Sequence, residues 1–302
     1  MLSLLADATT QPIVWADLGL RPGIELGFFT LRFYSLAYLV GILLGYWHLT
    51  RMIRQPGAPM ASRHADDLFF WCTLGIILGG RLGYATFYTG GDTGIPSLWG
   101  QPLELLKLWE GGMSFHGGVL GVLAAIAWVC RQGGLSFLRV CDYIAVNVPF
   151  GMFLGRLANF INGELYGRQT DVPWAMVFPT DPLQVGRHPS QLYQAGLEGA
   201  LMIVVMLYLF WRTRARYRPG LMVGVFTVGV AGARFINEFF REPDAQLAEF
   251  TRQTGLSMGQ WLSVPLILGG VALIIYALKR PPVGTAAAPS RDPEERTASA
   301  AG

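Results

Sequence analysis

The chain of 302 residues has few charges, few cysteines and few histidines, and each shortage excludes something. Only 14% of its residues are charged, against about a quarter in soluble proteins, which excludes an ordinary soluble fold. The 3 cysteines, Cys72, Cys130 and Cys141, are an odd number without metal-ligand spacing. They therefore argue against a disulfide framework or a zinc site and favour a packing role. No two of the 4 histidines have a metal-binding spacing, so no metal is expected.

Several motifs that would define other classes of protein are also missing. The chain has no Gly-x-Ser-x-Gly elbow, no phosphate-binding loop and no dinucleotide fingerprint, and we expect no cofactor. Its arginines are not interleaved with aromatic residues on a soluble face, which excludes a nucleic-acid partner. The opening residues 1–5 are too short and uncharged for a signal peptide. The absence of an evident internal repeat disfavours an inverted-repeat transporter.

What the chain does contain is hydrophobic sequence: 52% of its residues are hydrophobic and 9 are tryptophan. Because a spanning helix needs about 20 mostly apolar residues, this composition predicts an all-α integral membrane protein with seven transmembrane helices. The predicted spans are 28–50, 66–89, 114–131, 137–162, 189–211, 220–240 and 260–279. The predicted organisation is an N-terminal segment over 1–27, a seven-helix membrane domain over 28–280 and a disordered tail over 281–302.

The distribution of basic residues predicts how the chain is oriented in the membrane. The links after the first, third and fifth spans are rich in arginine, and the last span ends in Lys279-Arg280. The alternate links are acidic or balanced. Basic links stay in the cytoplasm, so the N-terminus is expected outside and the C-terminus inside.

An unusual polar run, Gly155–Arg168, ends the fourth predicted span. It holds two arginines, two asparagines and one glutamate among glycines: Arg156, Arg168, Asn159, Asn162 and Glu164. An ionisable residue inside a bilayer costs roughly 2.5–3.5 kcal/mol, so it usually faces a partner or a polar cavity. A single arginine could be a snorkelling anchor, whereas a cluster of this size favours a functional site.

The sixth predicted span carries a second polar stripe. At helical spacing Arg234, Asn237, Glu238 and Arg241 share one face. An internal ion pair between Arg234 and Glu238 is the structural alternative. Two arginines facing one glutamate nevertheless leave positive charge, and guanidinium groups bind phosphate oxygens in a bidentate way. The stripe therefore predicts a binding site for an anionic phospholipid that enters from the outer leaflet.

The predicted orientation places further polar residues toward the same outer side: Tyr34, Arg81, His116 and His188. His116, at a helix start, is either a capping or packing residue or, beside arginines, a general base. Ser114 and Ser190 each lie two residues from a histidine, which weakly permits an intramembrane hydrolase. A lipid or anion transporter would also gather arginines, but it would need access from both sides. A non-enzymatic role, as a scaffold or an assembly factor, would not explain the buried arginines.

These residues resemble the prolipoprotein diacylglyceryl transferase family over about residues 25–280. The matching motifs are Gly155-Arg156-x-x-Asn159-Phe160-Ile161-Asn162-Gly163-Glu164-Leu165-x-Gly167-Arg168, Gly112-Met113-Ser114-Phe115-His116-Gly117-Gly118, His188-Pro189-Ser190-Gln191-Leu192-Tyr193, Arg234-x-x-x-Glu238-Phe239-Phe240-Arg241 and Ser257-Met258-Gly259-Gln260, together with Tyr34. Their order along the chain and the seven-helix layout match the family as well.

The resemblance implies an enzyme of the bacterial cytoplasmic (inner) membrane, multi-pass, with a periplasmic N-terminus and an active site toward the outer leaflet. The family moves the diacylglyceryl group of phosphatidylglycerol onto the thiol of the lipobox cysteine of a prolipoprotein signal peptide. A thioether forms and glycerol 1-phosphate leaves, in the first step of lipoprotein maturation. The implied partners are phosphatidylglycerol, the signal peptide and membrane lipids.

The resemblance also implies residue roles. The implied catalytic residues are His116, Arg156, Arg234, Glu238 and Tyr34. The implied substrate-binding residues are Arg156, Asn159, Asn162, Gly163, Glu164, Gly167, Arg81, Arg241 and His188. Arg156 and Arg234 would hold the phosphate, His116 is the suggested base, and Glu164 and Glu238 would orient the arginines. This chain has Gln194 where relatives often have glutamate, and Val230 where they often have tyrosine, so neither position is given a role.

Overall fold

The computed structural model describes residues 12–27, 30–87, 112–242 and 254–284. These residues belong to two compact units. The first unit covers Met1–His48 and Ile144–Pro281, and the second covers Leu49–Tyr143 and Pro282–Gly302. The ends of the first two predicted spans, 28–29 and 88–89, and residues 285–302 of the predicted tail lie outside the described residues.

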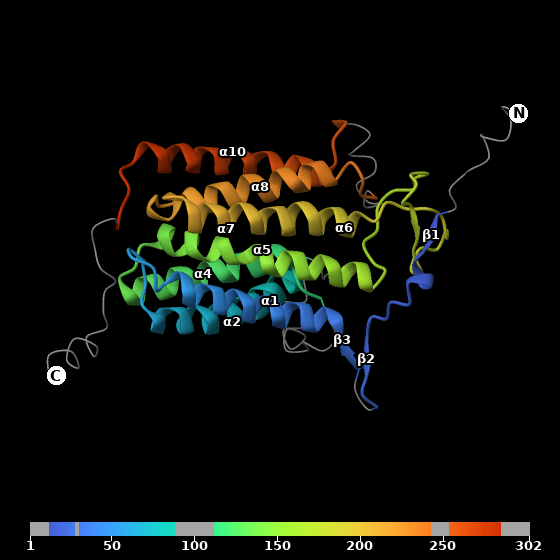
Figure 1. Ribbon diagram of the computed structural model, residues 1–302, viewed down its shortest axis with the longest axis horizontal. Helices are drawn as coiled ribbons and strands as arrows, with labels where there is room; N and C mark the ends of the chain where they lie inside the picture. Colours follow the sequence, from blue (N-terminus) through green and yellow to red (C-terminus); the bar gives the residue numbers. More distant parts are fainter. Residues whose placement is uncertain (1–11, 28–29, 88–111, 243–253, 285–302) are drawn as a thin grey trace, which may run out of the picture. The chain divides into compact units, whose positions relative to one another are not determined.

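Long helices dominate the described part of the chain (Figure 1). They are α1 (Phe33–Met52), α2 (Ser62–Phe87), α4 (Phe115–Gly133), α5 (Phe137–Ile161), α6 (Ser190–Gln194), the π-helical segment η6 (Ala195–Leu201), α7 (Met202–Arg212), α8 (Leu221–Asn237) and α10 (Met258–Lys279). Among the described residues six helices are long and apolar enough to cross a membrane, with α6, η6 and α7 counted as one. The prediction of a multi-pass helical membrane protein is therefore confirmed.

The sixth predicted span, 220–240, corresponds to the shorter helix α8. This apolar helix has 17 residues, begins after Gly220 with φ of +89° and ends at Asn237. At about 1.5 Å per residue its length is about 26 Å, a little less than the hydrocarbon core of a bilayer. The polar residues that follow it form turns and continue toward Arg241.

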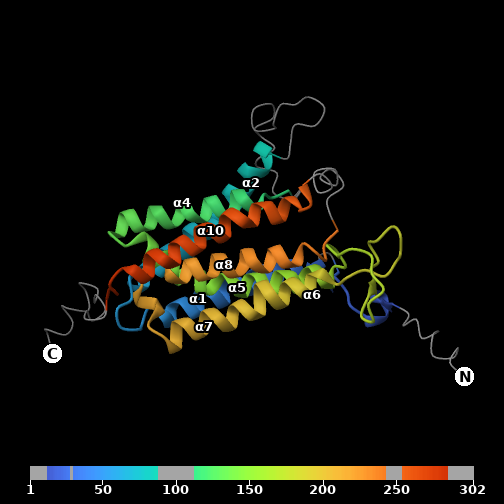
Figure 2. The same ribbon diagram turned by 90° about the horizontal axis from the view of Figure 1, so that it is seen from above.

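In the first unit, α8 and α10 lie side by side, as both views show (Figures 1 and 2). Glycines allow this close approach: a Cβ atom on Gly224 would lie 3.0 Å from the carbonyl oxygen of Gly270. Small residues at a helix interface bring backbones together in lipid, where there is no hydrophobic driving force between helices. The pair α8–α10 carries the arginine stripe at one end.

In the second unit, α2 and α4 form an even closer pair. A Cβ on Gly79 would lie 2.3 Å from the carbonyl oxygen of Gly117, and one on Gly121 would lie 2.0 Å from that of Gly75. The contacts are reciprocal and involve glycines spaced by four residues, a pattern typical of close helix packing in membranes. This pairing fixes the start of α4, where His116 lies.

Short strands accompany the helices of the first unit. Within the described residues, β1 (Ile13–Val14) pairs in parallel with β4 (Met176–Val177), and β2 (Gly23–Glu25) pairs antiparallel with β3 (Thr30–Arg32). The short helix η2 (Trp15–Leu18) follows β1, and a second one, η7 (Ala215–Tyr217), follows α7. Residues 13–15, which were predicted only as part of an N-terminal segment, thus lie against residues 175–178.

A small apolar cluster ties this region to the end of α5. Trp15, Met176 and Phe178 are buried together, and Phe160 and Tyr166 pack against them. The indole nitrogen of Trp15 donates a hydrogen bond to the carbonyl oxygen of Phe160 (2.9 Å). That carbonyl is in the last turn of α5, where helical carbonyls lack partners inside the helix. The cluster therefore holds the polar run that follows in place.

Candidate functional site

The polar run after α5 folds back on its own helix. Gly163 has a φ of +67°, a conformation that favours glycine, and reverses the chain at the helix end. The Glu164 carboxylate returns toward the last turns of α5 and accepts hydrogen bonds from Asn159 (2.9 Å) and Asn162 (3.2 Å). Glu164 thus orients the two predicted headgroup ligands rather than an arginine.

Arg156, three residues before Asn159 in α5, points to a different acid. Its guanidinium Nη2 lies 3.4 Å from the Oε2 atom of Glu198, a residue of η6. The Glu198 side chain is 2% exposed and that of Arg156 is 23% exposed, so the carboxylate is buried behind the guanidinium. Part of the Arg156 side chain therefore stays accessible to a ligand.

The predicted stripe forms at the end of α8 and in the turns that follow it, and it centres on Glu238. The Oε1 atom of this carboxylate lies 3.5 Å from Arg234 and 3.3 Å from Arg241. The carboxylate is 8% exposed, whereas the side chains of Arg234 and Arg241 are 39% and 27% exposed. The ion pair between Arg234 and Glu238 that the sequence suggested does form, and Glu238 orients both arginines.

The start of α10 holds Glu238 from its other side. Ser257 and Gln260 form a capping box, in which each side chain accepts a hydrogen bond from the other residue's backbone N–H. The Ser257 hydroxyl also donates to Glu238 Oε2 (3.0 Å). A Cβ on Gly259 would lie 2.6 Å from the Glu238 carboxyl carbon, so a larger residue there would displace this carboxylate. The motif before the last helix is therefore part of the site.

The loop after α5 is attached to the end of α8 through backbone contacts. The backbone N–H of Arg168 donates to the carbonyl of Phe240 (2.9 Å), and its side chain donates to the carbonyl of Arg241 (2.7 Å). A Cβ on Gly167 would lie 2.2 Å from the Phe240 carbonyl oxygen and 2.9 Å from the His188 Cβ. Gly167 is thus a close-approach position that joins the two polar segments.

His188 is packed in an aromatic environment beside this contact. Its ring meets Tyr193 and Phe240 edge to face, and Nδ1 lies 3.1 Å from the Tyr193 hydroxyl. Burial lowers the pKa of His188 below its ordinary value, because the cationic form is less well solvated there. The imidazole is therefore neutral at pH 7.

A second ion-pair system stabilises the loop farther along. Arg187 donates two hydrogen bonds to Asp181 (2.8 and 2.9 Å) and lies 2.9 Å from Glu242. The bidentate bond to Arg187 lowers the pKa of Asp181 below its usual range, and the same bond raises the pKa of Arg187. Sequence reasoning missed this pair, because its partners follow no helical periodicity.

The remaining predicted site residues belong to different parts of the molecule. Tyr34 in α1 is half-buried, bonds the Tyr38 hydroxyl (3.0 Å) and lies within electrostatic range of Arg156 and Glu164. Arg81 and His116 belong to the second unit. Arg81 is buried and donates to the carbonyl of Gly112 (3.1 Å), and His116 is exposed.

The two serines of the hydrolase alternative both have structural partners. The Ser114 hydroxyl accepts the backbone N–H of Gly117 as the N-cap of α4. The Ser190 hydroxyl donates to the carbonyl of Leu165 (3.0 Å). Neither arrangement is the serine–histidine pair that activates a nucleophile.

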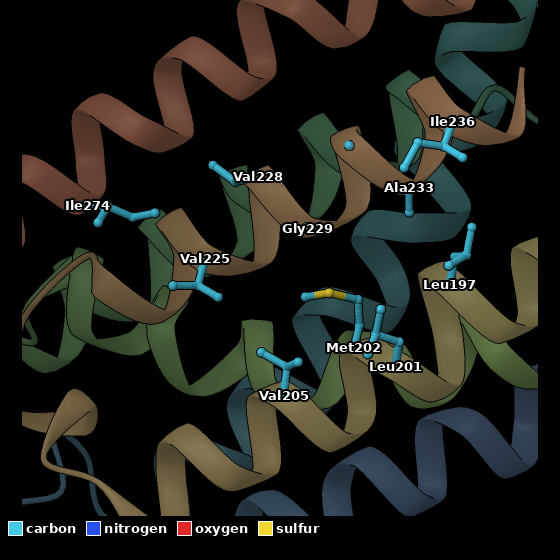
Figure 3. Close-up of a pocket in the computed structure, with 11 residues that line it drawn as sticks. Leu197, Leu201, Met202, Val205, Val225, Val228, Gly229, Ala233, Ile236 and Ile274 are labelled. Atoms are coloured by element: carbon cyan, nitrogen blue, oxygen red, sulfur yellow. The ribbon is translucent and has the colours of Figure 1, made fainter.

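An apolar groove of about 430 Å³ begins beside the charged cluster, between η6–α7 and α8 (Figure 3). It is lined by Leu197, Leu201, Met202, Val205, Val225, Val228, Gly229, Gly232, Ala233, Ile236 and Ile274. Leu197 precedes Glu198, and Ala233 precedes Arg234, so the charged cluster and the groove share the same helical turns. Figure 3 shows the aliphatic side chains of η6–α7 and α8 directed toward one another.

Sequence reasoning missed Glu198, although a signal for it existed. It is an acidic residue inside the apolar span 189–211, and an ionisable residue at membrane depth is a functional hypothesis by default. Glu198 is, however, the one charged residue in the interior of this span, whereas the predicted clusters each hold several charges close together. In the structure, Glu198 is the contact of Arg156.

The fold and the site together define a multi-pass helical membrane protein with a cluster of partly accessible arginines beside an apolar groove. The sequence model of the family described as prolipoprotein diacylglyceryl transferase matches residues 23–276, and the chain belongs to this family. The relative from Erythrobacter litoralis is 69% identical over 286 residues, which cover 95% of this chain and 99% of the relative.

Two further relatives are about half identical to the chain. The one from Zymomonas mobilis is 51% identical and covers 83% of this chain and 85% of its own length. The one from Azospirillum brasilense is 50% identical, with 85% and 94% covered. All three relatives are named phosphatidylglycerol–prolipoprotein diacylglyceryl transferase.

Proposed function

We propose that this chain transfers the diacylglyceryl group of phosphatidylglycerol to the thiol of the lipobox cysteine of prolipoproteins. The products are a thioether-linked lipoprotein precursor and glycerol 1-phosphate. This is the activity in the names of the relatives, and the chain matches the first of them over 99% of its length. The proposed partners are therefore phosphatidylglycerol, the signal peptide and the surrounding membrane lipids.

The observation that carries this proposal is the sorting of charge in the site. The named polar residues include four arginines, Arg156, Arg168, Arg234 and Arg241, against three glutamates, Glu164, Glu198 and Glu238. Glu198 and Glu238 are at most 8% exposed, whereas the side chains of their partners Arg156, Arg234 and Arg241 are 23–39% exposed. An approaching anion therefore meets guanidinium groups, which suits a phosphodiester headgroup.

The chemistry needs this positive charge on one side of the reacting carbon. The lipobox thiol loses its proton to a base, and the thiolate forms a C–S bond to the glyceryl carbon that carries the phosphate. The C–O bond to the phosphate breaks, and its electron pair leaves with glycerol 1-phosphate. The phosphate thereby changes from a singly to a doubly charged group. Arginines positioned before the reaction stabilise the added charge, an effect worth a few kcal/mol in comparable sites.

We assign the residue roles accordingly. Arg156 and Arg234 hold the phosphate and the leaving oxygen, with Arg241 adding positive charge. Glu238 orients Arg234 and Arg241, and Glu164 orients Asn159 and Asn162 toward the headgroup. Tyr34 adds a hydroxyl near Arg156.

The remaining roles concern the loop and the second unit. Gly163 and Gly167 let the loop turn and approach α8, and His188 packs against that contact. His116 is the proposed base, which its exposed position at the start of α4 permits. Arg81 is proposed as a headgroup contact.

The groove between η6–α7 and α8 is suited to an acyl chain of the lipid. Its lining is entirely aliphatic apart from the thioether of Met202, and it starts at the turns that carry Glu198 and Arg234. A lipid whose phosphate lies at the arginines would find apolar surface where its chain begins. Transfer of an acyl chain from water into the groove is favourable by about 0.8 kcal/mol per methylene. The gain is smaller when the chain comes from a detergent micelle or a bilayer, where it is already out of water.

The membrane placement is part of the same proposal. We propose seven spans in the bacterial inner membrane, with α8 as the sixth, the N-terminus in the periplasm and the C-terminus in the cytoplasm. Basic residues after α1, α7 and α10 support this orientation. The arginine cluster then faces the outer leaflet. Residues 1–27 form the periplasmic start, residues 28–280 the catalytic membrane domain, and residues 281–302 a cytoplasmic tail.

The test is a transfer assay with purified protein, phosphatidylglycerol and a synthetic signal peptide that ends in a lipobox cysteine. We expect the peptide to gain the mass of one diacylglyceryl group. Arg234→Ala should abolish the gain while the protein stays folded, and Arg212→Ala, an exposed arginine at the end of α7, should not. Folded protein that leaves the peptide mass unchanged would overturn the proposal, and lipid movement between vesicles would then be measured.

A further inference from the structure

The buried carboxylate of Glu198 is the feature of the site that neither the motifs nor the family name assign. It lies in η6, between α6 and α7, and the residue is 1% exposed. Taking a charge out of water is costly unless a partner compensates it. Its Oε2 atom lies 3.4 Å from Arg156, and its Oε1 atom has no hydrogen-bond partner among the described residues. The carboxylate is therefore held mainly through Arg156.

Glu198 also acts on the arginine of α8. Its carboxylate is within electrostatic range of both Arg234 and Glu238. Glu238, the residue that follows the last one of α8, approaches Arg234 at i,i+4 spacing. Arg234 thus lies in the field of two buried carboxylates, one at the C-terminal cap of its own helix and one on η6. Glu198 is the acid that interacts with the arginines of both α5 and α8.

The local backbone explains how Glu198 is kept beside Arg156. Residues Ala195–Leu201 form a π-helical turn, a wider helix that is rare and frequently occurs at functional sites. The next residue, Gly199, touches α5: a Cβ there would lie 2.7 Å from the Cα of Phe153. Phe153 precedes Arg156 by three residues, about one helical turn. The wide turn and the glycine contact therefore bring the carboxylate against the α5 arginine.

We propose that Glu198 is a positioning residue for the transfer reaction, holding the Arg156 guanidinium where negative charge develops on the leaving phosphate. This inference rests on the proposed function. Because Glu198 is buried behind Arg156, it acts through the arginine and does not touch the lipid. Its loss leaves Arg156 charged but unanchored, so the effect falls on the transition state and appears in kcat.

The experiment is a double-mutant cycle in the same transfer assay, with Glu198→Gln and Arg156→Lys alone and combined. Glu198→Gln keeps the size of the side chain and removes its charge. We expect it to lower kcat at least tenfold and to change KM for phosphatidylglycerol less than threefold. We expect the double variant to be no slower than Arg156→Lys alone, because residues that act through one another show non-additive losses. Glu198→Asp should recover part of the activity.

A matched control separates positioning from general destabilisation. Asp142 in α5 is also 1% exposed, so Asp142→Asn removes a comparably buried carboxylate outside the arginine cluster. We expect it to leave kcat per folded molecule unchanged. If Glu198→Gln does not fold, the cycle is run with Glu198→Asp, whose carboxylate is one methylene farther from Arg156.

The outcomes are distinguishable. Normal kcat in Glu198→Gln, or losses that multiply in the double variant, would overturn the positioning role while the transferase activity stands. Absence of transfer by the folded wild-type protein would instead overturn the proposed function itself.

Discussion

Two acids of the candidate site, Glu198 and Glu238, are buried, Glu164 is half-buried, and each of the three has a different set of partners. Glu164 accepts from two asparagines, Glu198 contacts Arg156, and Glu238 contacts two arginines and a serine. Removing one partner of a buried pair is costly because the remaining charge is left uncompensated. We therefore expect single substitutions here to affect stability as well as activity, and activity has to be expressed per folded molecule.

The pair of Asp181 and Arg187 predicts acid sensitivity of the loop after α5. The folded-state pKa of Asp181 is lowered, so its contribution to stability is complete above the unfolded value of about 3.9. It is lost as pH falls from there through the folded pKa. Asp181→Asn should destabilise the protein at pH 7 by about 3 kcal/mol and flatten this acid dependence. Thermal unfolding in detergent between pH 7 and pH 3 measures the loss of stability and its pH dependence. If the variant lost stability with falling pH as steeply as the wild-type protein, the role of Asp181 would be contradicted.

Among the helices, close packing through glycine recurs in both units. It brings α2 against α4 and α8 against α10, and the backbone contacts leave no space for a side chain at several positions. Such contacts maximise dispersion between helices in lipid. They also determine where the polar residues at the helix ends lie, since His116 comes directly before the α2–α4 contact at Gly117 and Arg234 comes after the α8–α10 contact at Gly224.

Two glycines of α4 provide a matched test of this packing. A Cβ at Gly121 would lie 2.0 Å from the Gly75 carbonyl oxygen, whereas one at Gly118 would meet its nearest atom at 3.8 Å. We expect Gly121→Ala to destabilise the protein by about 1–3 kcal/mol through overpacking. Gly118→Ala should be neutral or slightly stabilising, because alanine favours helix. Thermal unfolding in detergent compares them, and equal effects would argue against the close contact.

The groove predicts a change in acyl-chain preference. Gly232 lines it, and a Cβ there would meet nothing within 4 Å, so a larger side chain fits the folded protein and fills the groove. We expect Gly232→Leu to lower turnover of long-chain phosphatidylglycerol at least tenfold relative to a short-chain form. Gly269→Leu, at an equally open glycine of α10, is the control. An unchanged ratio of the two lipids would mean that the chain lies elsewhere.

For the molecule as a whole, the distribution of arginine predicts the direction in which every helix crosses the membrane. We expect a membrane-impermeant maleimide to label Leu183→Cys, an exposed position of the loop after α5, in spheroplasts with intact inner membranes. Arg214→Cys, after α7, should be labelled only once the membranes are opened. Both variants are made without the native cysteines. The opposite pattern would contradict the proposed orientation and the outer-leaflet position of the site.

Much of this organisation is encoded locally and was predictable. Apolar runs of about 20 residues predict spans whatever their neighbours. The structure has helical residues in each of the seven predicted ranges, and in the part of the chain that it describes six of these helices are long and apolar enough to cross a membrane. The stripe of Arg234, Glu238 and Arg241 follows from helical periodicity, and its ion pairs are confirmed. Other features depend on residues far apart in the chain. The contact of Arg156 with Glu198 and the pairing of β1 with β4 have no sequence periodicity and were missed.

The sequence by itself determined the class of protein, the approximate positions of its helices and the polar residues of its site, because hydropathy and helical spacing act over a few turns. Only the tertiary structure decided which carboxylate pairs with which arginine. Glu164 contacts asparagines, Glu238 takes two arginines, and Arg156 goes to Glu198. The physical reason is that a buried charge takes the nearest partner, and the packing of helices decides which one is near.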